Sequence, residues 1–209
     1  MGKDGIRPRQ TGDKGLMTEK IILIGYGGQG MMLFGRLLAR ATMLDGKQVT
    51  FFPSYGTEVR GGAACYHLIV STEEIYSPVV EEADTIIAMN QPSYLKLKNY
   101  LKPSSLLFLN SSLVKEVESL NEITTYRIPA TEIANELGNV VASNMVMMGA
   151  YNTIKNLVPL PLFLECLQSS LRGRKAPLLE VNTLALLRGE EYVKKTYLKG
   201  ERIFKTSAV

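Results

Sequence analysis

The stretch that most constrains the fold is IILIGYGGQGMMLFGRLLARA, at residues 21–41. It opens with four consecutive aliphatic residues, a pattern typical of a strand buried on both faces of a parallel sheet. Glycines at 25, 27, 28 and 30 then permit a tight turn. Beyond them, apolar residues recur at helical spacing as far as Leu44, with Arg36 and Arg40 on the opposite face. The order strand, glycine turn, helix predicts an α/β fold.

A turn of this kind directs backbone N–H groups and the positive end of a helix dipole toward one point, which suits a phosphate. GYGGQG also matches G-x-G-x-x-G, although that pattern alone is weak evidence and a close strand-to-helix crossover could simply require small residues. Dinucleotide sites place an acidic residue at the end of the second strand. The strand predicted at 48–52 is followed instead by Pro53, and Asp45 precedes it. An ordinary nicotinamide site is therefore disfavoured.

Composition predicts one globular domain, since 45% of the 209 residues are hydrophobic and 21% are charged. We expect an N-terminal extension at 1–17, a domain at 18–188 and a basic tail at 189–209. No apolar run approaches the roughly 20 residues of a membrane span, and the polar N-terminus is unlike a signal peptide, so we expect a cytoplasmic protein. Lysines near the C-terminus alternate with acidic and aromatic residues, which argues against a nucleic-acid partner.

Two cysteines and one histidine limit the metal chemistry open to this chain. A cubane iron–sulfur cluster normally takes four thiolates, and a structural zinc takes four Cys or His ligands. Cys65 and His67 lie two residues apart on a predicted strand and so share one face. They could form a nucleophilic pair, but a pair buried in the sheet is the favoured interpretation.

The second informative stretch is PSYGTEVRGG, at residues 53–62. Pro53 is predicted to end the second strand, and Glu58 and Arg60 place two charges in the loop that follows. The loop could be a plain surface connection. It could also bind a ligand, because it follows the carboxyl end of a strand beside the glycine turn. A strand at 63–70 and a second arm at 75–80 are predicted to form an antiparallel hairpin.

Later strands are predicted at 85–89, 106–109 and 126–128, and two of them run into Asn90 and the NSS of 110–112. These polar groups should lie at the same edge of the sheet as the glycine turn. Helices are predicted from Pro129 to a Gly138 cap, from an N-cap pair at Ser143 and Asn144, within 157–171, and at 178–188 between Pro177 and Gly189. The fold class is a three-layer α/β/α sandwich with a mostly parallel Rossmann-like sheet, an antiparallel hairpin edge and C-terminal helices.

Four segments together resemble the gamma subunit of 2-oxoacid:ferredoxin oxidoreductases: GYGGQG at 25–30, PSYGTEVRGGAAC at 53–65, SPVVEEADTIIAMNQ at 77–91 and NMVMMGAY at 144–151. The resemblance covers about residues 18–188. Tyr26 and SYGTEVRGG are more similar to the 2-oxoglutarate and branched-chain types than to the pyruvate type.

The resemblance implies a subunit of an enzyme that oxidatively decarboxylates a 2-oxoacid, with 2-oxoglutarate as the expected one, to its acyl-coenzyme A and passes electrons to ferredoxin. It implies alpha, beta and delta partner subunits that carry thiamine diphosphate, Mg and the 4Fe-4S clusters, with coenzyme A at the surface of this chain in the complex. No catalytic residue or metal ligand is expected here. The residues expected to contact the cofactor are Gly25, Gly27, Gly28, Gln29, Gly30, Ser54, Tyr55, Glu58, Arg60, Asn90 and Asn144.

Specific roles are expected for two groups among these residues. The backbone amides of 27–30 are expected to donate to a phosphate or to a partner's backbone. Glu58 and Arg60 are expected to form a salt link across a subunit interface or, through the arginine, to contact phosphate. Two alternatives remain: a free-standing Rossmann-type dehydrogenase, and the gamma-like chain of an indolepyruvate oxidoreductase.

Overall fold

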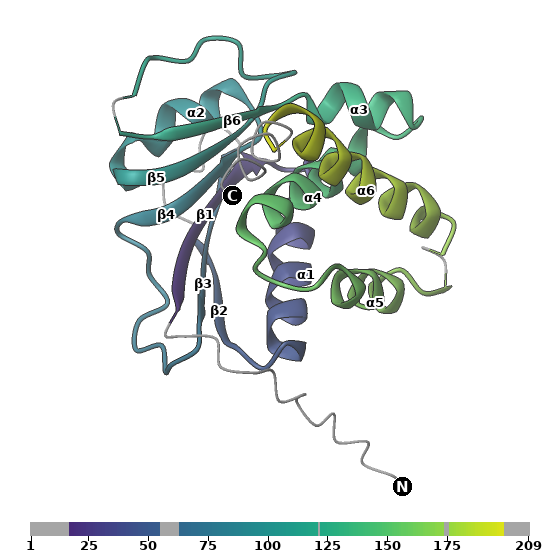
Figure 1. Ribbon diagram of the computed structural model, residues 1–209, viewed down its shortest axis with the longest axis horizontal. Helices are drawn as coiled ribbons and strands as arrows, with labels where there is room; N and C mark the ends of the chain where they lie inside the picture. The colour runs from purple at the N-terminus through teal and green to yellow at the C-terminus, as the bar shows by residue number, and fades with distance from the viewer. Residues whose placement is uncertain (1–16, 55–62, 121, 174–175, 199–209) are drawn as a thin grey trace, which may run out of the picture.

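The computed structural model describes residues 17–54, 63–120, 122–173 and 176–198, which form a sheet with helices on both faces (Figure 1). The strands are β1 (Thr18–Tyr26), β2 (Gln48–Ser54), β3 (Ala63–Ser71), β4 (Ala83–Ala88), β5 (Leu101–Asn110) and β6 (Thr124–Ile128). The helices are α1 (Met31–Leu44), α2 (Gln91–Lys96), α3 (Ala130–Glu136), α4 (Ser143–Lys155), α5 (Leu160–Ser170) and α6 (Leu178–Thr196), with short 3₁₀ turns η2 (Leu97–Tyr100) and η3 (Val140–Ala142). The predicted three-layer α/β/α fold is confirmed.

The strands are arranged in the order β2-β3-β1-β4-β5-β6. β1, β4, β5 and β6 pair in parallel, whereas β3 is antiparallel to both of its neighbours. The predicted antiparallel edge of the sheet is therefore present, but β2 and β3 form it and not the predicted pair 63–70 and 75–80. The second arm predicted at 75–80 is wrong, because in the described chain that segment forms no strand. It contains Pro78, which has no backbone N–H for a ladder, and Val80 donates its N–H to His67 Nδ1 instead.

The prediction that Pro53 ends the second strand is wrong. The strand continues to Ser54, and Pro53 lies opposite Tyr66 of β3. β2 is the outermost strand on this side, so the missing N–H of a proline is tolerated there. The prediction was wrong because a proline is incompatible with a strand in the middle of a sheet but not with a strand at its edge.

The uninterrupted apolar run of β1 packs on both faces of the sheet. Ile21 and Leu23 belong to the core shared with α1, α4, α5 and α6, whereas Ile22 and Ile24 face the layer that contains Tyr94 of α2. All four residues are 2% exposed or less. This two-sided burial explains why β1 shows no alternation of polar and apolar residues.

α4 and α6 cross at two glycines, Gly149 and Gly189. A methyl group on Gly149 would lie 1.9 Å from the carbonyl oxygen of Leu186, and one on Gly189 would lie 1.9 Å from that of Val146. Gly189 therefore permits a close helix crossing and does not end a helix. The predicted end at residue 188 is wrong, because α6 continues to Thr196.

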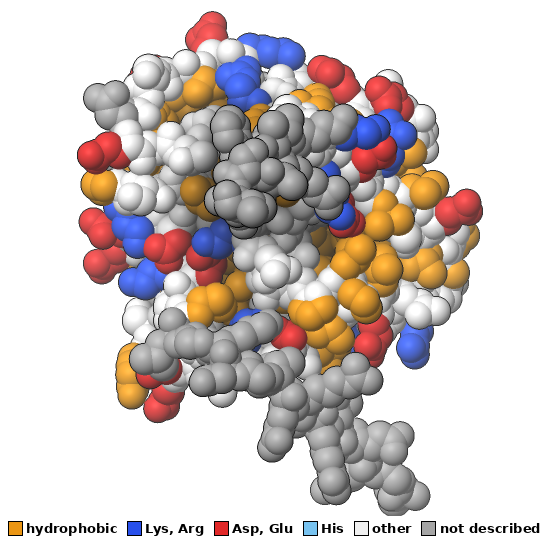
Figure 2. All heavy atoms as spheres, in the orientation of Figure 1, with side chains coloured by type: hydrophobic (Ala, Val, Ile, Leu, Met, Phe, Trp, Pro, Cys, Tyr) orange, Lys and Arg blue, Asp and Glu red, His pale blue; other side chains and the backbone are white. Residues whose placement is uncertain are grey.

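α6 is an outer element of the helical layer, and its solvent side carries exposed Leu178, Leu184 and Leu187. Figure 2 shows hydrophobic side chains gathered on the right of this face, over α5 and α6. Contiguous exposed apolar side chains are typical of surfaces that contact another protein. None of the described helices combines the length and apolar character that crossing a membrane would require.

Candidate functional site

The carboxyl ends of β1, β4 and β5 meet at one edge of the sheet, and polar residues follow each of them. The glycine turn follows β1, Asn90 follows β4, and Asn110 ends β5. Gln29 Nε2 and Asn110 Nδ2 donate to the same acceptor, the carbonyl oxygen of Met89, over 3.4 and 3.2 Å. The prediction that these groups gather at the rim of the glycine turn is therefore confirmed.

Two glycines of the turn adopt the left-handed backbone conformation. Gly28 has φ of 90° and Gly30, the N-cap of α1, has φ of 73°. A Cβ on Gly30 would also lie 2.2 Å from Asn144 Nδ2, so position 30 requires glycine for both conformation and space. Gly25 is buried near the end of β1.

The side chain of Gln29 fills the inside of the turn. Its Oε1 accepts hydrogen bonds from Tyr26 N at 2.8 Å and from Asn90 Nδ2 at 2.6 Å. The backbone N–H of Gln29 donates to Tyr26 O at 3.1 Å. Gln29 therefore has no free backbone donor for a phosphate, which corrects the expectation that all four amides of 27–30 are available.

What the turn leaves accessible is the backbone of Gly27 and Gly28. Both residues are exposed, and a Cβ on either would meet no described atom within 4 Å. The adjacent N-terminus of α1 receives no hydrogen bond from a capping side chain among the residues placed here. The N–H groups of a first helical turn and the helix dipole favour an anion or a carbonyl oxygen at this point.

Asn90 and Asn144 both lie at the turn, but neither presents its amide to solvent. Asn90 is 5% exposed and, besides bonding Gln29, accepts from Ser93 N at 2.9 Å as the N-cap of α2. Asn144 is 2% exposed, and its Nδ2 donates to Gly30 O at 3.0 Å. The predicted N-cap pair at 143 and 144 is wrong: α4 begins at Ser143 itself, and Asn144 holds the start of α1.

Asn110 and Thr131 also belong to this network, although neither is among the site residues predicted from the sequence. Asn110 Nδ2 donates to Thr131 Oγ1 at 2.7 Å, and Asn110 Oδ1 accepts from Thr131 N at 3.3 Å. This pair ties the end of β5 to the first turn of α3. The signal that could have found Asn110 is its place at the end of a buried strand, the same position that Asn90 has after β4.

The remaining predicted contacts come from the hairpin. Ser54 ends β2 opposite Cys65, which in turn lies opposite Ile24 of β1. Ser54 is thus at the same edge as the glycine turn but two strand spacings, about 10 Å, from β1. Tyr55, Glu58 and Arg60 lie outside the described residues, so their predicted roles remain predictions.

Cys65 and His67 share a face of β3, with Sγ and Nε2 3.9 Å apart. His67 Nδ1 accepts the Val80 N–H at 2.9 Å, which places the imidazole proton on Nε2. His67 therefore points a donor, and not a base, at the thiol. Burial raises the pKa of Cys65 to about 11, so the thiolate is scarce at neutral pH. The interpretation as a pair buried in the sheet accounts for this geometry.

Stability should depend on the protonation of His67. Burial lowers the pKa of His67 from its ordinary 6.5, so the folded state binds the proton less readily than the unfolded chain. The neutral histidine therefore contributes stability above about pH 6.5, and this contribution declines as pH falls through the lowered pKa, by at most about 1.4 kcal/mol per pH unit. Urea unfolding of wild type and His67→Gln from pH 7.5 to 5 should show a steeper decline for wild type. Parallel curves would contradict the assignment.

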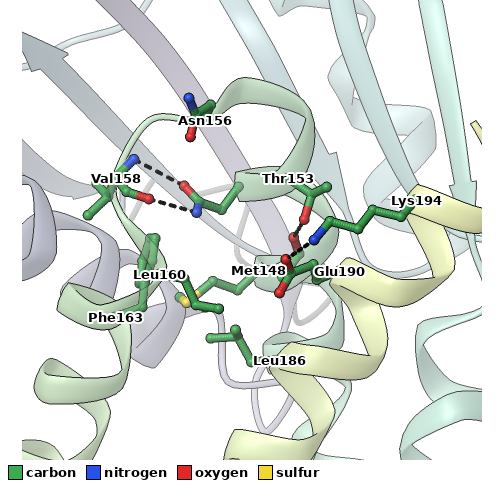
Figure 3. Close-up of a pocket in the computed structure, with 11 residues that line it drawn as sticks. Met148, Thr153, Asn156, Val158, Leu160, Phe163, Leu186, Glu190 and Lys194 are labelled. Carbon is green, nitrogen blue, oxygen red and sulfur yellow. Dashed lines mark hydrogen bonds and ion pairs between the residues drawn. The ribbon is translucent and has the colours of Figure 1, made fainter. Parts of the chain in front are cut away.

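A cavity of about 220 Å³ lies between α4, α5 and α6 (Figure 3). Two pairs of polar groups lie in its lining: Asn152 bonds both the N–H and the carbonyl of Val158, and Lys194 pairs with Glu190. Pockets for drug-sized ligands are roughly 300–1,000 Å³, so this space is too small for coenzyme A. None of the predicted contact residues that the structure describes lines it. The cavity lies at a junction between helices and is separate from the edge of the sheet that carries the glycine turn.

The sequence matches the family model described as pyruvate ferredoxin/flavodoxin oxidoreductase over residues 20–192. Among curated proteins, it is 33% identical to the 2-oxoglutarate synthase subunit KorC of Methanocaldococcus jannaschii. That alignment covers 86% of this chain and 96% of the relative.

Two solved structures share the fold. The gamma subunit of a keto/oxoacid ferredoxin oxidoreductase from Geobacter sulfurreducens superposes with a TM-score of 0.74 at 28% identity, over 85% of this chain and 99% of that one. The 2-oxoglutarate:ferredoxin oxidoreductase of Magnetococcus marinus, solved with 2-oxoglutarate, coenzyme A and succinyl-CoA, superposes with a TM-score of 0.76 at 25% identity. There the match covers 85% of this chain but 31% of the other, so the equivalent of this chain is one part of a longer polypeptide.

Proposed function

Because this chain belongs to the pyruvate ferredoxin/flavodoxin oxidoreductase family, we propose that it is the gamma subunit of a 2-oxoacid:ferredoxin oxidoreductase, with 2-oxoglutarate as the 2-oxoacid. The assembled enzyme converts the 2-oxoacid and coenzyme A to acyl-coenzyme A and carbon dioxide, and two electrons pass to ferredoxin. The near-complete alignment with a 2-oxoglutarate synthase subunit supports both the subunit and the substrate.

The role proposed for this chain is to position coenzyme A and to help enclose the thiamine site. The observation that carries this proposal is the exposed backbone of Gly27 and Gly28 beside the uncapped start of α1. A surface without side chains allows a ligand to approach the backbone closely, and the helix dipole favours a phosphate there. Holding the thiol carrier in place and excluding water are contributions that a chain without catalytic residues can make.

The redox and thiamine chemistry is assigned to alpha, beta and delta partner chains. Four thiolates normally hold a cubane cluster, whereas this chain has two cysteines, one on β3 and one on α5. Across the described ranges, no three His, Cys, Asp or Glu side chains come together as a metal site. The residues therefore do not fit the clusters, and the exposed leucines of α6 support assembly with chains that do.

A free-standing dinucleotide-binding dehydrogenase is the second candidate, and two features of the rim disfavour it. In the usual dinucleotide fold a parallel strand lies on each side of β1, but here antiparallel β3 takes one of those positions. Gln29 Oε1 also occupies the inside of the turn. Titration with NADH or NADPH distinguishes the candidates, since the proposed subunit should bind neither at micromolar concentration. An indolepyruvate enzyme is distinguished by trials of aryl 2-oxoacids on the assembled complex.

Substitution of Gly28 tests the coenzyme A contact. Gly28→Val places a branched side chain on the exposed turn at a positive φ, and we expect the KM for coenzyme A to rise about tenfold with little change in the KM for the 2-oxoacid. Initial rates of ferredoxin reduction by the assembled enzyme measure both constants.

The matched control for this test is Gly138→Val. Gly138 also has a positive φ, 76°, and open space at Cβ among the described atoms, but it follows α3. Its substitution should leave both KM values unchanged. If Gly28→Val reduces only the amount of assembled enzyme, and not its affinity for coenzyme A, the residue has a scaffolding role instead.

A further inference from the structure

We propose that Asn90 is a positioning residue that sets the shape of the glycine turn through the side chain of Gln29. The inference rests on the proposed function, because it concerns the surface assigned to coenzyme A. The sequence predicts Asn90 as a direct contact to the cofactor, but at 5% exposure it acts from behind the turn.

The orientation of the Gln29 amide is fixed at both ends. Oε1 accepts from Asn90 Nδ2 at 2.6 Å, and Nε2 donates to Met89 O at 3.4 Å. With the amide held this way, Oε1 also accepts the Tyr26 N–H at 2.8 Å, across the base of the turn. A reversed amide would turn its NH₂ toward two donors, Asn90 Nδ2 and Tyr26 N, and its oxygen toward the Met89 carbonyl. Asn90 therefore acts together with Tyr26 N and Met89 O to select the orientation that closes the turn.

Asn90 is itself held by the element that follows it. Its Oδ1 accepts from Ser93 N at 2.9 Å, which caps α2 and leaves Nδ2 as the group that faces Gln29. The Met89 carbonyl is fixed in turn by Asn110 Nδ2, which also bonds Thr131. The network thus connects the start of α2, on one face of the sheet, with the turn that precedes α1 on the other face. Gly27 and Gly28 lie in that turn, between Tyr26 and Gln29.

Asn90→Asp separates the two roles of the residue. The carboxylate still accepts from Ser93 N and keeps the cap of α2, but it has no hydrogen to donate to Gln29 Oε1 and repels that oxygen. The matched control is Asn139→Asp. Asn139 caps η3 through a hydrogen bond from Val141 N to its Oδ1, without a second side-chain bond in the portion of the chain described here.

The first measurement is amide hydrogen exchange on the full chain. Asn90→Asp should accelerate exchange at Tyr26 about tenfold, as expected for loss of one hydrogen bond, and leave Ser93 unchanged. The second measurement is steady-state kinetics of the assembled enzyme, in which the KM for coenzyme A should rise about tenfold while kcat changes less than about twofold. Asn139→Asp should alter neither.

Unchanged exchange at Tyr26 overturns the proposed relay. Faster exchange with an unchanged KM for coenzyme A overturns the positioning role, provided that Gly28→Val raises that KM and the proposed function stands. If neither variant affects the KM, the coenzyme A contact itself is overturned together with the positioning role.

Discussion

Replacing Gly149 by alanine is expected to lower the free energy of unfolding by about 3 kcal/mol, because the added methyl group would lie 1.9 Å from the carbonyl oxygen of Leu186. That atom belongs to the backbone of α6, so no side-chain rotation relieves the contact and the two helices must separate. Separation weakens the packing of Val146, Leu186 and Val193, which are 2% exposed or less. Urea denaturation of the isolated chain measures the effect.

The reciprocal substitution provides an internal check on this helix crossing. Gly189→Ala should destabilise by a similar amount, and the double variant should lose less than the two single losses added together, because one displacement of α6 relieves both contacts. Gly27→Ala is the control, since Gly27 is exposed and its added methyl group meets no described atom within 4 Å. A loss below about 1 kcal/mol for Gly149→Ala would contradict the close crossing.

Removal of the buried lysine at the end of α1 should have an effect of the same order. Lys47 is 8% exposed, pairs with Asp45 and donates from Nζ to Leu157 O at 2.8 Å. Lys47→Met leaves the 5% exposed carboxylate of Asp45 without its lysine partner and frees the connection after α4. We expect a loss of about 3–5 kcal/mol in the free energy of unfolding, the usual result of removing one partner from a buried ion pair.

A second substitution separates charge burial from packing in this pair. Adding Asp45→Asn to Lys47→Met should restore part of the lost stability, because the buried negative charge that lost its lysine is then absent. Lys102→Met is the control: its pair with Asp84 is about 30% exposed on both sides and should contribute no more than about 1 kcal/mol. Equal losses for Lys47→Met and Lys102→Met would show that burial does not govern the effect.

Local patterns in the sequence predicted the elements that local physics determines. The run at 21–24, the glycine turn and the amphipathic helix that follows all depend on residues close together in the chain. The polar rim could also be predicted, because parallel strands end at a shared edge and Asn90 and Asn110 are strand-end residues.

The errors concern features determined by distant residues. Gly189 looks like a helix end until Val146 of α4 is placed against it. Asn144 looks like half of a capping pair until Gly30 supplies its carbonyl acceptor, 114 positions away. β3 lies between β2 and β1 because it pairs with residues far away in the sequence. The order of the strands along the chain does not reveal this arrangement.

Within the glycine turn, the sequence pattern could not reveal the role of Gln29. G-x-G-x-x-G describes where side chains are absent, whereas the conformation of this turn depends on one side chain that is present. The Gln29 side chain accepts hydrogen bonds at the place in the turn where the pattern would put a phosphate. The accessible surface that remains is the exposed backbone of Gly27 and Gly28.

The assignment as a subunit is tested most directly by isolating this chain from its native cell under anaerobic conditions and assaying the material that accompanies it. Ferredoxin or viologen reduction is followed with 2-oxoglutarate, pyruvate, branched-chain and aryl 2-oxoacids, each with and without coenzyme A. Larger chains should co-purify, and 2-oxoglutarate should support reduction that depends on coenzyme A. Recovery of the chain alone, with no such activity in any fraction that contains it, would contradict the assignment.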